Sequence, residues 1–190
     1  MKKKGLIIAI VVIAVVVIIA GALIGSYNGL VEQNENVLTA QSTISTQLQR
    51  RADLIPNFVA TVKGYSDYEQ ETFTAVTKAR SAVANADSVS EQAEASAQLD
   101  SAIDIWVNAV TEAYPELKAS EQYIALQDEL AGTENRIAVA RKDYNDIAKK
   151  YNTTIKKFPR SILAGLFGFE TYDYFEADSS AQSVPQVSFD

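Results

Sequence analysis

The sequence contains no cysteine and no histidine among its 190 residues. The absence of cysteine excludes disulfides, thiolate zinc sites, iron-sulfur clusters and cysteine nucleophiles. The absence of histidine excludes Ser-His-Asp catalysis, histidine-bound haem or zinc, and the Glu-x-x-His di-iron site. The chain also has no EF-hand loop, no glycine-rich phosphate loop and no nucleophile elbow. We therefore predict no catalytic residue, no metal site and no cofactor, and we do not expect an enzyme.

Basic residues are fewer than acidic ones, 17 against 24. Three of the basic residues, Lys2, Lys3 and Lys4, lie at the amino terminus, so the rest of the chain carries 14 basic and 24 acidic side chains, a net charge of −10. Binding to nucleic acid phosphates needs a net basic face. We therefore do not expect nucleic acid as a partner.

One long apolar run extends from Gly5 to Gly25, 21 residues without a polar side chain. As a helix it would span about 30 Å, the thickness of the hydrocarbon core of a bilayer. The sequence MKKK precedes the run, whereas Glu32 and Glu35 follow it, so the positive-inside rule places the amino terminus in the cytoplasm and the rest of the chain outside. The alternative is a secretory signal cleaved after Ala20-Gly21-Ala22. We expect an uncleaved single-pass anchor in the cell membrane.

A heptad pattern of apolar residues runs from Tyr27 to Tyr65 and predicts a long helix over residues 27–64. The pattern keeps its phase through Pro56, which indicates a kink within one helix and not a loop. A second heptad pattern predicts another long helix over residues 116–157. Shorter helices are expected between them, at about 67–86 and 88–113, each after a predicted capping box, Ser66 to Glu69 and Ser88 to Glu91.

These patterns predict an all-α protein, an antiparallel four-helix bundle preceded by a transmembrane helix. The expected organisation is a cytoplasmic basic stub at 1–4, the anchor at 5–25, the bundle at 26–158, an apolar segment at 159–175 and a disordered acidic tail at 176–190.

Three heptad positions of the first long helix are polar. If the two long helices are antiparallel neighbours, the numbers of facing residues sum to about 185. Each polar residue then faces a polar partner, as buried polar groups require. The predicted pairs are Asn34 with Tyr151, Gln41 with Tyr144, and Arg51 with Glu134 as a structural ion pair.

The apolar segment after the last long helix returns to the membrane surface in this topology. It combines large apolar side chains with nearby basic ones, which suits the headgroup layer. Folding back to cap the apolar end of the bundle is the alternative, and the sequence leaves both open. The predicted membrane-proximal residues are Leu163, Leu166, Phe167, Phe169, Lys156, Lys157 and Arg160.

Several strings resemble the LemA family of bacterial membrane-associated helical-bundle proteins. They are YNGLV at residues 27–31, RRADLIPNFV with VKGY after it, the stretch from YPELKASEQY to NTTIKKFP, and AGLFGF with YFE after it. Together they cover roughly residues 27–176. The resemblance implies a membrane-attached antiparallel helical bundle without an established enzymatic activity, and it supplies no catalytic residue.

We expect a structural or scaffold role in the cell envelope. The expected partners are membrane lipid and either further copies of the chain or another membrane protein. The alternative is a ligand-sensing module outside the cytoplasm. Because MKKK is too short to transmit a signal, such a sensor would act through a separate membrane partner.

Overall fold

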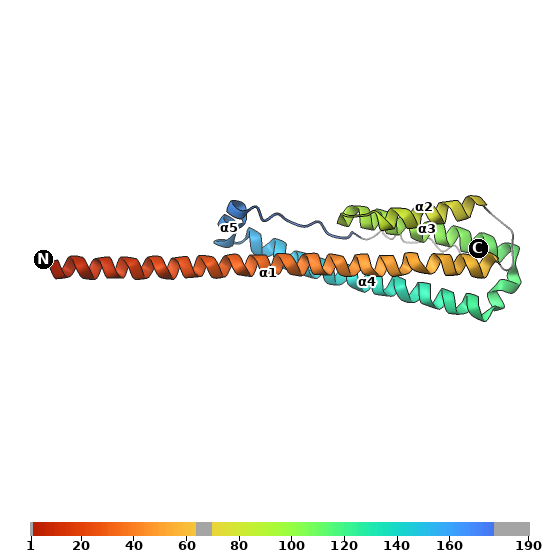
Figure 1. Ribbon diagram of the computed structural model, residues 1–190, viewed down its shortest axis with the longest axis horizontal. Coiled ribbons are helices and arrows are strands. Elements are labelled where there is room, and N and C mark those ends of the chain that lie inside the picture. The colour runs from red at the N-terminus through yellow and green to blue at the C-terminus, as the bar shows by residue number, and fades with distance from the viewer. Residues whose placement is uncertain (1, 64–69, 177–190) are drawn as a thin grey trace, which may run out of the picture. The chain divides into compact units, whose positions relative to one another are not determined.

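The structure, a computed structural model, describes residues 2–63 and 70–176 (Figure 1). Within these ranges every regular element is a helix and there is no strand. The elements in chain order are α1 (Lys2–Lys63), α2 (Gln70–Ala84), α3 (Val89–Ala113), the 3₁₀ helix η1 (Pro115–Ala119), α4 (Glu121–Lys156) and α5 (Arg160–Phe167). The predicted all-α class is confirmed.

The apolar run and the first long helix form one continuous helix, α1. The sequence predicts two helices, at 5–25 and 27–64, but no proline separates them and the glycines at 21, 25 and 29 are tolerated within α1. Pro56 lies inside α1. The helix continues past it because Ile55 and Phe58 on either side are buried, 3% and 1% exposed. The kink itself stays a prediction.

The start of α3 has the predicted capping box. The Ser88 hydroxyl accepts a hydrogen bond from the Glu91 backbone N–H at 3.2 Å, and the Glu91 carboxylate accepts from the Ser88 N–H at 3.0 Å. The hydrogen bonds from the Ser88 and Asp87 backbone hold the pKa of Glu91 below its ordinary value. The other predicted capping box, Ser66 to Glu69, lies outside the described residues, as does the predicted tail from residue 177 onward.

Helix α4 begins at Glu121, five residues later than predicted. The residues after Pro115 form η1, and Ser120 is extended, with φ −73° and ψ 128°. The Ser120 hydroxyl accepts a hydrogen bond from the Tyr123 N–H at 3.4 Å, as a helix-capping serine does. The helix begins after this cap and not at the proline.

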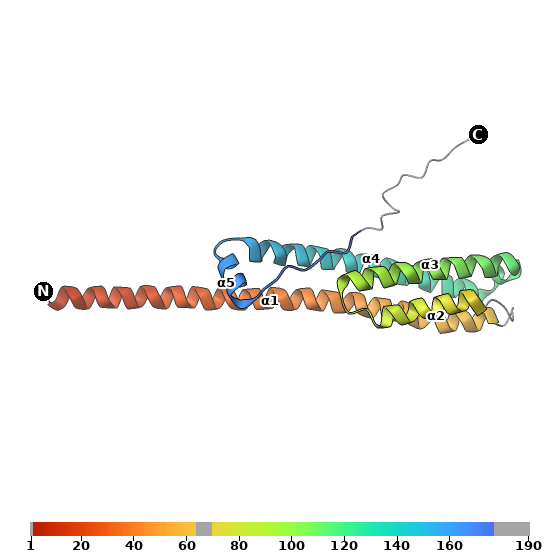
Figure 2. The same cartoon turned by 90° about the horizontal axis from the view of Figure 1, so that it is seen from above.

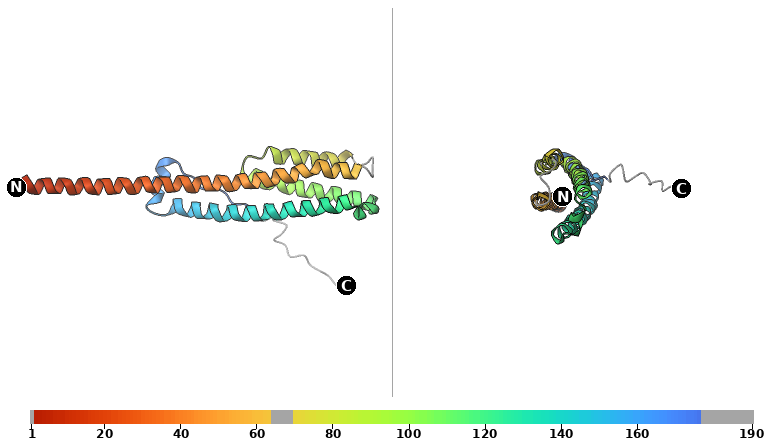
Figure 3. Two further views of the ribbon diagram at one scale, coloured as in Figure 1. Left: turned by 60° about the horizontal axis from the view of Figure 1, so that its bottom comes forward. Right: turned by 90° about the vertical axis from the view of Figure 1, so that its right-hand side faces the viewer.

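The described chain divides into two compact units. The first unit contains the described residues up to Thr39 and Asp146–Tyr172, and the second contains the described residues from Ala40 to Asn145 and from Asp173 onward. In the second unit α2 and α3 lie side by side, as Figures 2 and 3 show.

Most of the heptad positions of α1 and α4 that the structure describes are buried. In the second unit Phe58 of α1 is 1% exposed, and its ring centroid lies 4.9 Å from that of Trp106 in α3 and 5.8 Å from that of Tyr123 in α4. Three helices therefore meet in one aromatic core. Of the predicted stripe residues, those nearly inaccessible to solvent include Leu30, Val37, Ile44, Leu48, Ile137, Tyr144 and Tyr151.

Candidate functional site

The amino-terminal part of α1 is apolar and exposed. It is the one described helix long and apolar enough to cross a membrane, with a mean hydropathy of 3.5 in its most apolar stretch, none of which is buried. Large side chains from Leu6 to Ile24 are about half exposed or more. Exposed apolar surface of this extent marks a contact with a membrane or with another protein, and the length of this run fits the hydrocarbon core of a bilayer.

Helix α5 is short and two-sided. Leu163 and Ala164 are buried, 8% and 4% exposed, whereas Ile162 and Leu166 are 62% and 73% exposed. The helix ends at Gly168, whose φ of 72° suits glycine, and the Phe169 N–H donates to the Ala164 carbonyl at 2.9 Å. Gly168 is therefore the C-cap of this helix.

The predicted membrane-proximal residues lie in the first unit. The ring of Phe167 is 4.7 Å from that of Tyr27 and the ring of Phe169 is 5.9 Å from it, measured between centroids. Lys156 and Lys157 are exposed, Arg160 and Phe169 are half-buried, and Leu163 is buried. The inner face of α5 therefore folds back on the protein, whereas the outer face does not.

The predicted Asn34–Tyr151 pair is wrong, because Tyr172, a residue after α5, occupies the partner position of Asn34. Asn34 accepts a hydrogen bond from the Tyr172 hydroxyl at 2.9 Å. The Tyr151 hydroxyl, its predicted partner, is buried without a hydrogen-bond partner among the described residues, and the Tyr172 ring lies 5.4 Å from the Tyr151 ring. Tyr172 thus takes the place that the two-helix geometry assigned to Tyr151.

Gln41 and Tyr144 also form hydrogen bonds with connecting segments, and the predicted contact between the two stays a prediction. The Gln41 amide donates to the backbone carbonyl of Asp87, before α3, at 3.1 Å. The Tyr144 hydroxyl donates to the carbonyl of Asp173 at 3.0 Å. Each side chain therefore bonds to the backbone of a connecting segment, which a comparison of two helices alone does not include.

Asparagine side chains of α4 hold the segment after α5. In the first unit the Asn152 amide donates to the Tyr172 carbonyl at 2.8 Å and accepts from the Tyr172 N–H at 2.9 Å. In the second unit Asn145 makes the same two bonds with Phe175, at 2.8 and 2.9 Å. Each asparagine thereby satisfies both backbone groups of a residue that belongs to no helix.

Replacing Asn152 with Ala is expected to lower the free energy of unfolding by about 1–3 kcal/mol, because both backbone groups of Tyr172 lose their partner. Urea unfolding followed by circular dichroism at 222 nm measures this. The matched control is Asn108→Ala, at an exposed position of α3, which shares the gain in helix propensity. Equal stabilities of the two variants would contradict the role of Asn152.

A cluster of charges around the buried Arg51 lies in the second unit. Arg51 is 7% exposed, and the structure brings it together with Glu134 in an ion pair. Its guanidinium also contacts the carboxylate of Asp100 in α3 at 2.9 Å. Burial lowers the pKa of Arg51, against the attraction of Asp100 and Asp104. The pair expected between two helices is therefore a three-residue cluster joining α1, α3 and α4.

A groove of about 660 Å³ lies beside this cluster. Its lining combines acidic side chains, Arg141 and small residues, and includes Asp100, Asp104, Glu134 and Glu94. Among the described residues, no group of three acidic side chains is arranged to hold a metal ion. The groove offers carboxylates and a guanidinium for contacts with polar groups, but the chain contains no imidazole or thiol to act there.

Sequence reasoning missed Asp100, Asn152 and Tyr172. Asp100 directly follows Leu99, which is completely buried, so it lies at the edge of the buried face of α3. Asn145 and Asn152 are seven residues apart and share a helix face, which is the signal that could have indicated a repeated backbone contact.

Comparison with known proteins gives a family and several relatives. A model of the LemA family matches residues 40–189. Protein LemA of Metamycoplasma hominis is 29% identical over 81% of this chain and 70% of its own length. Magnetosome protein MamQ 2 of Paramagnetospirillum magneticum is 26% identical over 97% of this chain and 78% of its own length. Magnetosome protein MamQ of Magnetospirillum gryphiswaldense is 26% identical over 96% and 77%, respectively.

Proposed function

The chain belongs to the LemA family, and from that premise we propose that it is a single-pass membrane protein of the bacterial cell envelope with a structural or scaffold role. Its helices form an antiparallel bundle outside the cytoplasm. The observation that carries the proposal is the exposed apolar part of α1, which continues without a break into the helix that packs in the core of the second unit.

A structural role agrees with how the polar side chains are used. In the second unit the buried Arg51 forms ion pairs with the half-buried Asp100 and Glu134, and the asparagines of α4 bind backbone groups. The relatives named MamQ are magnetosome proteins, which agrees with a helical protein associated with a membrane. The partners are further copies of the chain or another membrane protein.

The orientation rests on charge. Three lysines precede the apolar run, whereas the acidic residues Glu32 and Glu35 follow it. Lysines are retained on the cytoplasmic side of a membrane-spanning helix, so the bundle lies on the opposite side.

Cysteine labelling in cells tests the anchor and the orientation, because the chain contains no native cysteine. Val139→Cys, at a position 59% exposed, is expected to react in intact cells with a maleimide that cannot cross the membrane. Lys4→Cys, the matched site on the other side, is expected to react only after the membrane is permeabilised. The reverse result would overturn the orientation, and full-length protein released by an alkaline carbonate wash would overturn the anchor.

Crosslinking in intact membranes tests the scaffold role. A ladder of identical subunits, or capture of several envelope proteins, is the expected result. Capture of one recurrent signalling protein would instead favour a sensor acting through that partner.

A further inference from the structure

The outer face of α5 is an unusually apolar surface for a segment outside an anchor. Phe158, Ile162 and Leu166 follow one another at intervals of four residues, which places them on one side of the helix and the turn before it. They are 82%, 62% and 73% exposed, and Phe167 beside them is 54% exposed. The opposite side, Leu163 and Ala164, is already packed against the protein. This outer stripe is thus left uncovered by the rest of the described chain.

The stripe lies next to the end of the membrane-spanning run. Tyr27, two residues after Gly25, contacts the rings of Phe167 and Phe169, which flank the C-cap of α5. A bilayer that surrounds residues 5–25 therefore has its headgroup layer at the level of Tyr27. Tyrosine rings at this depth are typical of membrane interfaces.

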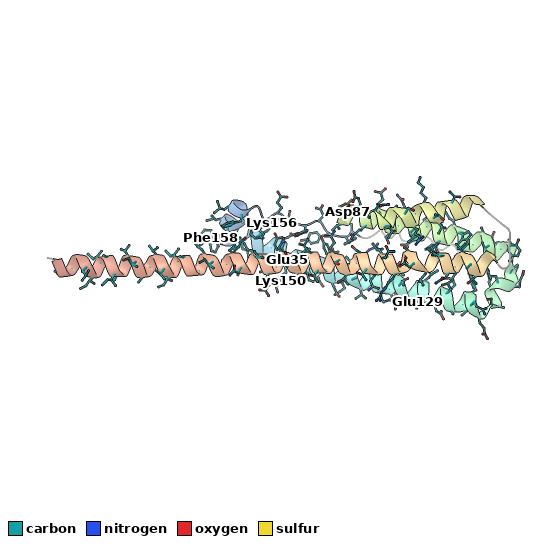
Figure 4. All side chains as sticks on the ribbon, viewed as in Figure 1. Glu35, Asp87, Glu129, Lys150, Lys156 and Phe158 are labelled. Carbon is teal, nitrogen blue, oxygen red and sulfur yellow. The ribbon has the colours of Figure 1, made fainter. Side chains whose placement is uncertain are left out.

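The charge of the same region suits a lipid surface. Lys156 and Lys157 are exposed and, with Arg160, lie around Phe158 at the turn from α4 to α5, where Figure 4 labels Lys156 and Phe158. From Asp146 to Tyr172 the chain has five basic and two acidic residues, although the chain as a whole is acidic. Lysine stems lie along apolar surface with their ammonium groups in the headgroup layer, where anionic lipid attracts them.

We propose that the outer face of α5 docks into the headgroup layer of the membrane that α1 crosses, with a preference for anionic lipid. This proposal rests on the anchor proposed above and adds a second contact with the membrane. A second copy of the chain is a less suitable occupant, because the stripe is small, is surrounded by like charges, and is held by the anchor within reach of lipid. With two contacts, the first unit cannot rotate freely about the axis of α1 relative to the membrane.

Depth-dependent fluorescence quenching in full-length protein tests the docking. Ile162→Cys carries the environment-sensitive fluorophore NBD, and the protein is reconstituted in phosphatidylcholine vesicles with and without phosphatidylglycerol. We expect doxyl-labelled lipid to quench this fluorophore, and more strongly with phosphatidylglycerol. Val139→Cys, of similar exposure but in the second unit, is the matched control and is expected not to be quenched.

Two further variants separate the causes of failure. Leu23→Cys lies in the apolar run, so if its fluorophore is not quenched, the anchor itself is wrong. If Leu23→Cys is quenched and Ile162→Cys behaves like Val139→Cys, only the docking of α5 is overturned. Lys156→Glu with Lys157→Glu is expected to abolish the added quenching from phosphatidylglycerol. Crosslinking of Ile162→Cys to a second copy, with no lipid quenching, would assign the stripe to an interface between copies and overturn the proposal.

Discussion

Replacing Asp100 with Asn and Glu134 with Gln in one protein is expected to lower the free energy of unfolding by about 3–5 kcal/mol. The reason is the position of Arg51, whose side chain is 9% exposed, whereas those of Asp100 and Glu134 are 31% and 44% exposed. A guanidinium stays charged at every accessible pH, so it cannot avoid its desolvation by losing a proton. Removing both carboxylates leaves the most buried charge of the cluster without its ion-pair partners. Urea unfolding followed by the fluorescence of Trp106, the single tryptophan, measures the effect.

A third substitution tests this explanation directly. Adding Arg51→Met to the double variant removes the buried charge but keeps the apolar stem, and is expected to restore most of the lost stability. Glu112→Gln, at an exposed position of α3, is the control and should change stability by less than about 0.5 kcal/mol. If Arg51→Met lowers the stability of the double variant further, packing and not charge explains the role of Arg51.

The features that follow from one periodic pattern could be predicted from the sequence. Apolar spacing alone indicates which side of a helix is buried, and Leu30, Ile44 and Ile137, all on the predicted stripes, are completely buried. Local hydrogen bonds can also be predicted from the sequence, since Ser88 and Glu91 form their capping box within four residues of chain. These predictions need no knowledge of which elements are neighbours in space.

Predictions that depended on the choice of neighbour were less reliable. The pairing of facing residues treated two long helices as if nothing else approached them. Tyr172 and the backbone of Asp87 and Asp173 then supplied the partners of Asn34, Gln41 and Tyr144. Periodicity does not reveal such contacts, because these residues belong to segments without a helical repeat.

The polar residues within the apolar stripe of α1 share one property. Asn34 bonds to the segment after α5, Gln41 to the loop before α3, and Arg51 to α3 and α4. Apolar contacts tolerate sliding of one helix along another, whereas each of these bonds is satisfied in one alignment only. We infer that they select the alignment of the elements, while the apolar residues supply most of the stability.

The second large effect is expected from Phe58→Ala, which should lower the free energy of unfolding by about 3–5 kcal/mol. The Phe58 ring fills the space between α1, α3 and α4, so its loss leaves a cavity lined by Trp106 and Tyr123 and removes two aromatic contacts. Trp106 fluorescence again follows the unfolding of the second unit in urea.

Phe158→Ala is the matched control, because it removes the same side chain from a position that is 82% exposed. In detergent it should change the free energy of unfolding by less than about 0.5 kcal/mol. In vesicles with phosphatidylglycerol it should reduce the lipid quenching of a fluorophore at residue 162, which Phe58→Ala should leave unchanged as long as the first unit stays folded. Stability therefore depends on the buried phenylalanine and lipid contact on the exposed one, and equal stability losses in detergent for both variants would contradict the assigned core.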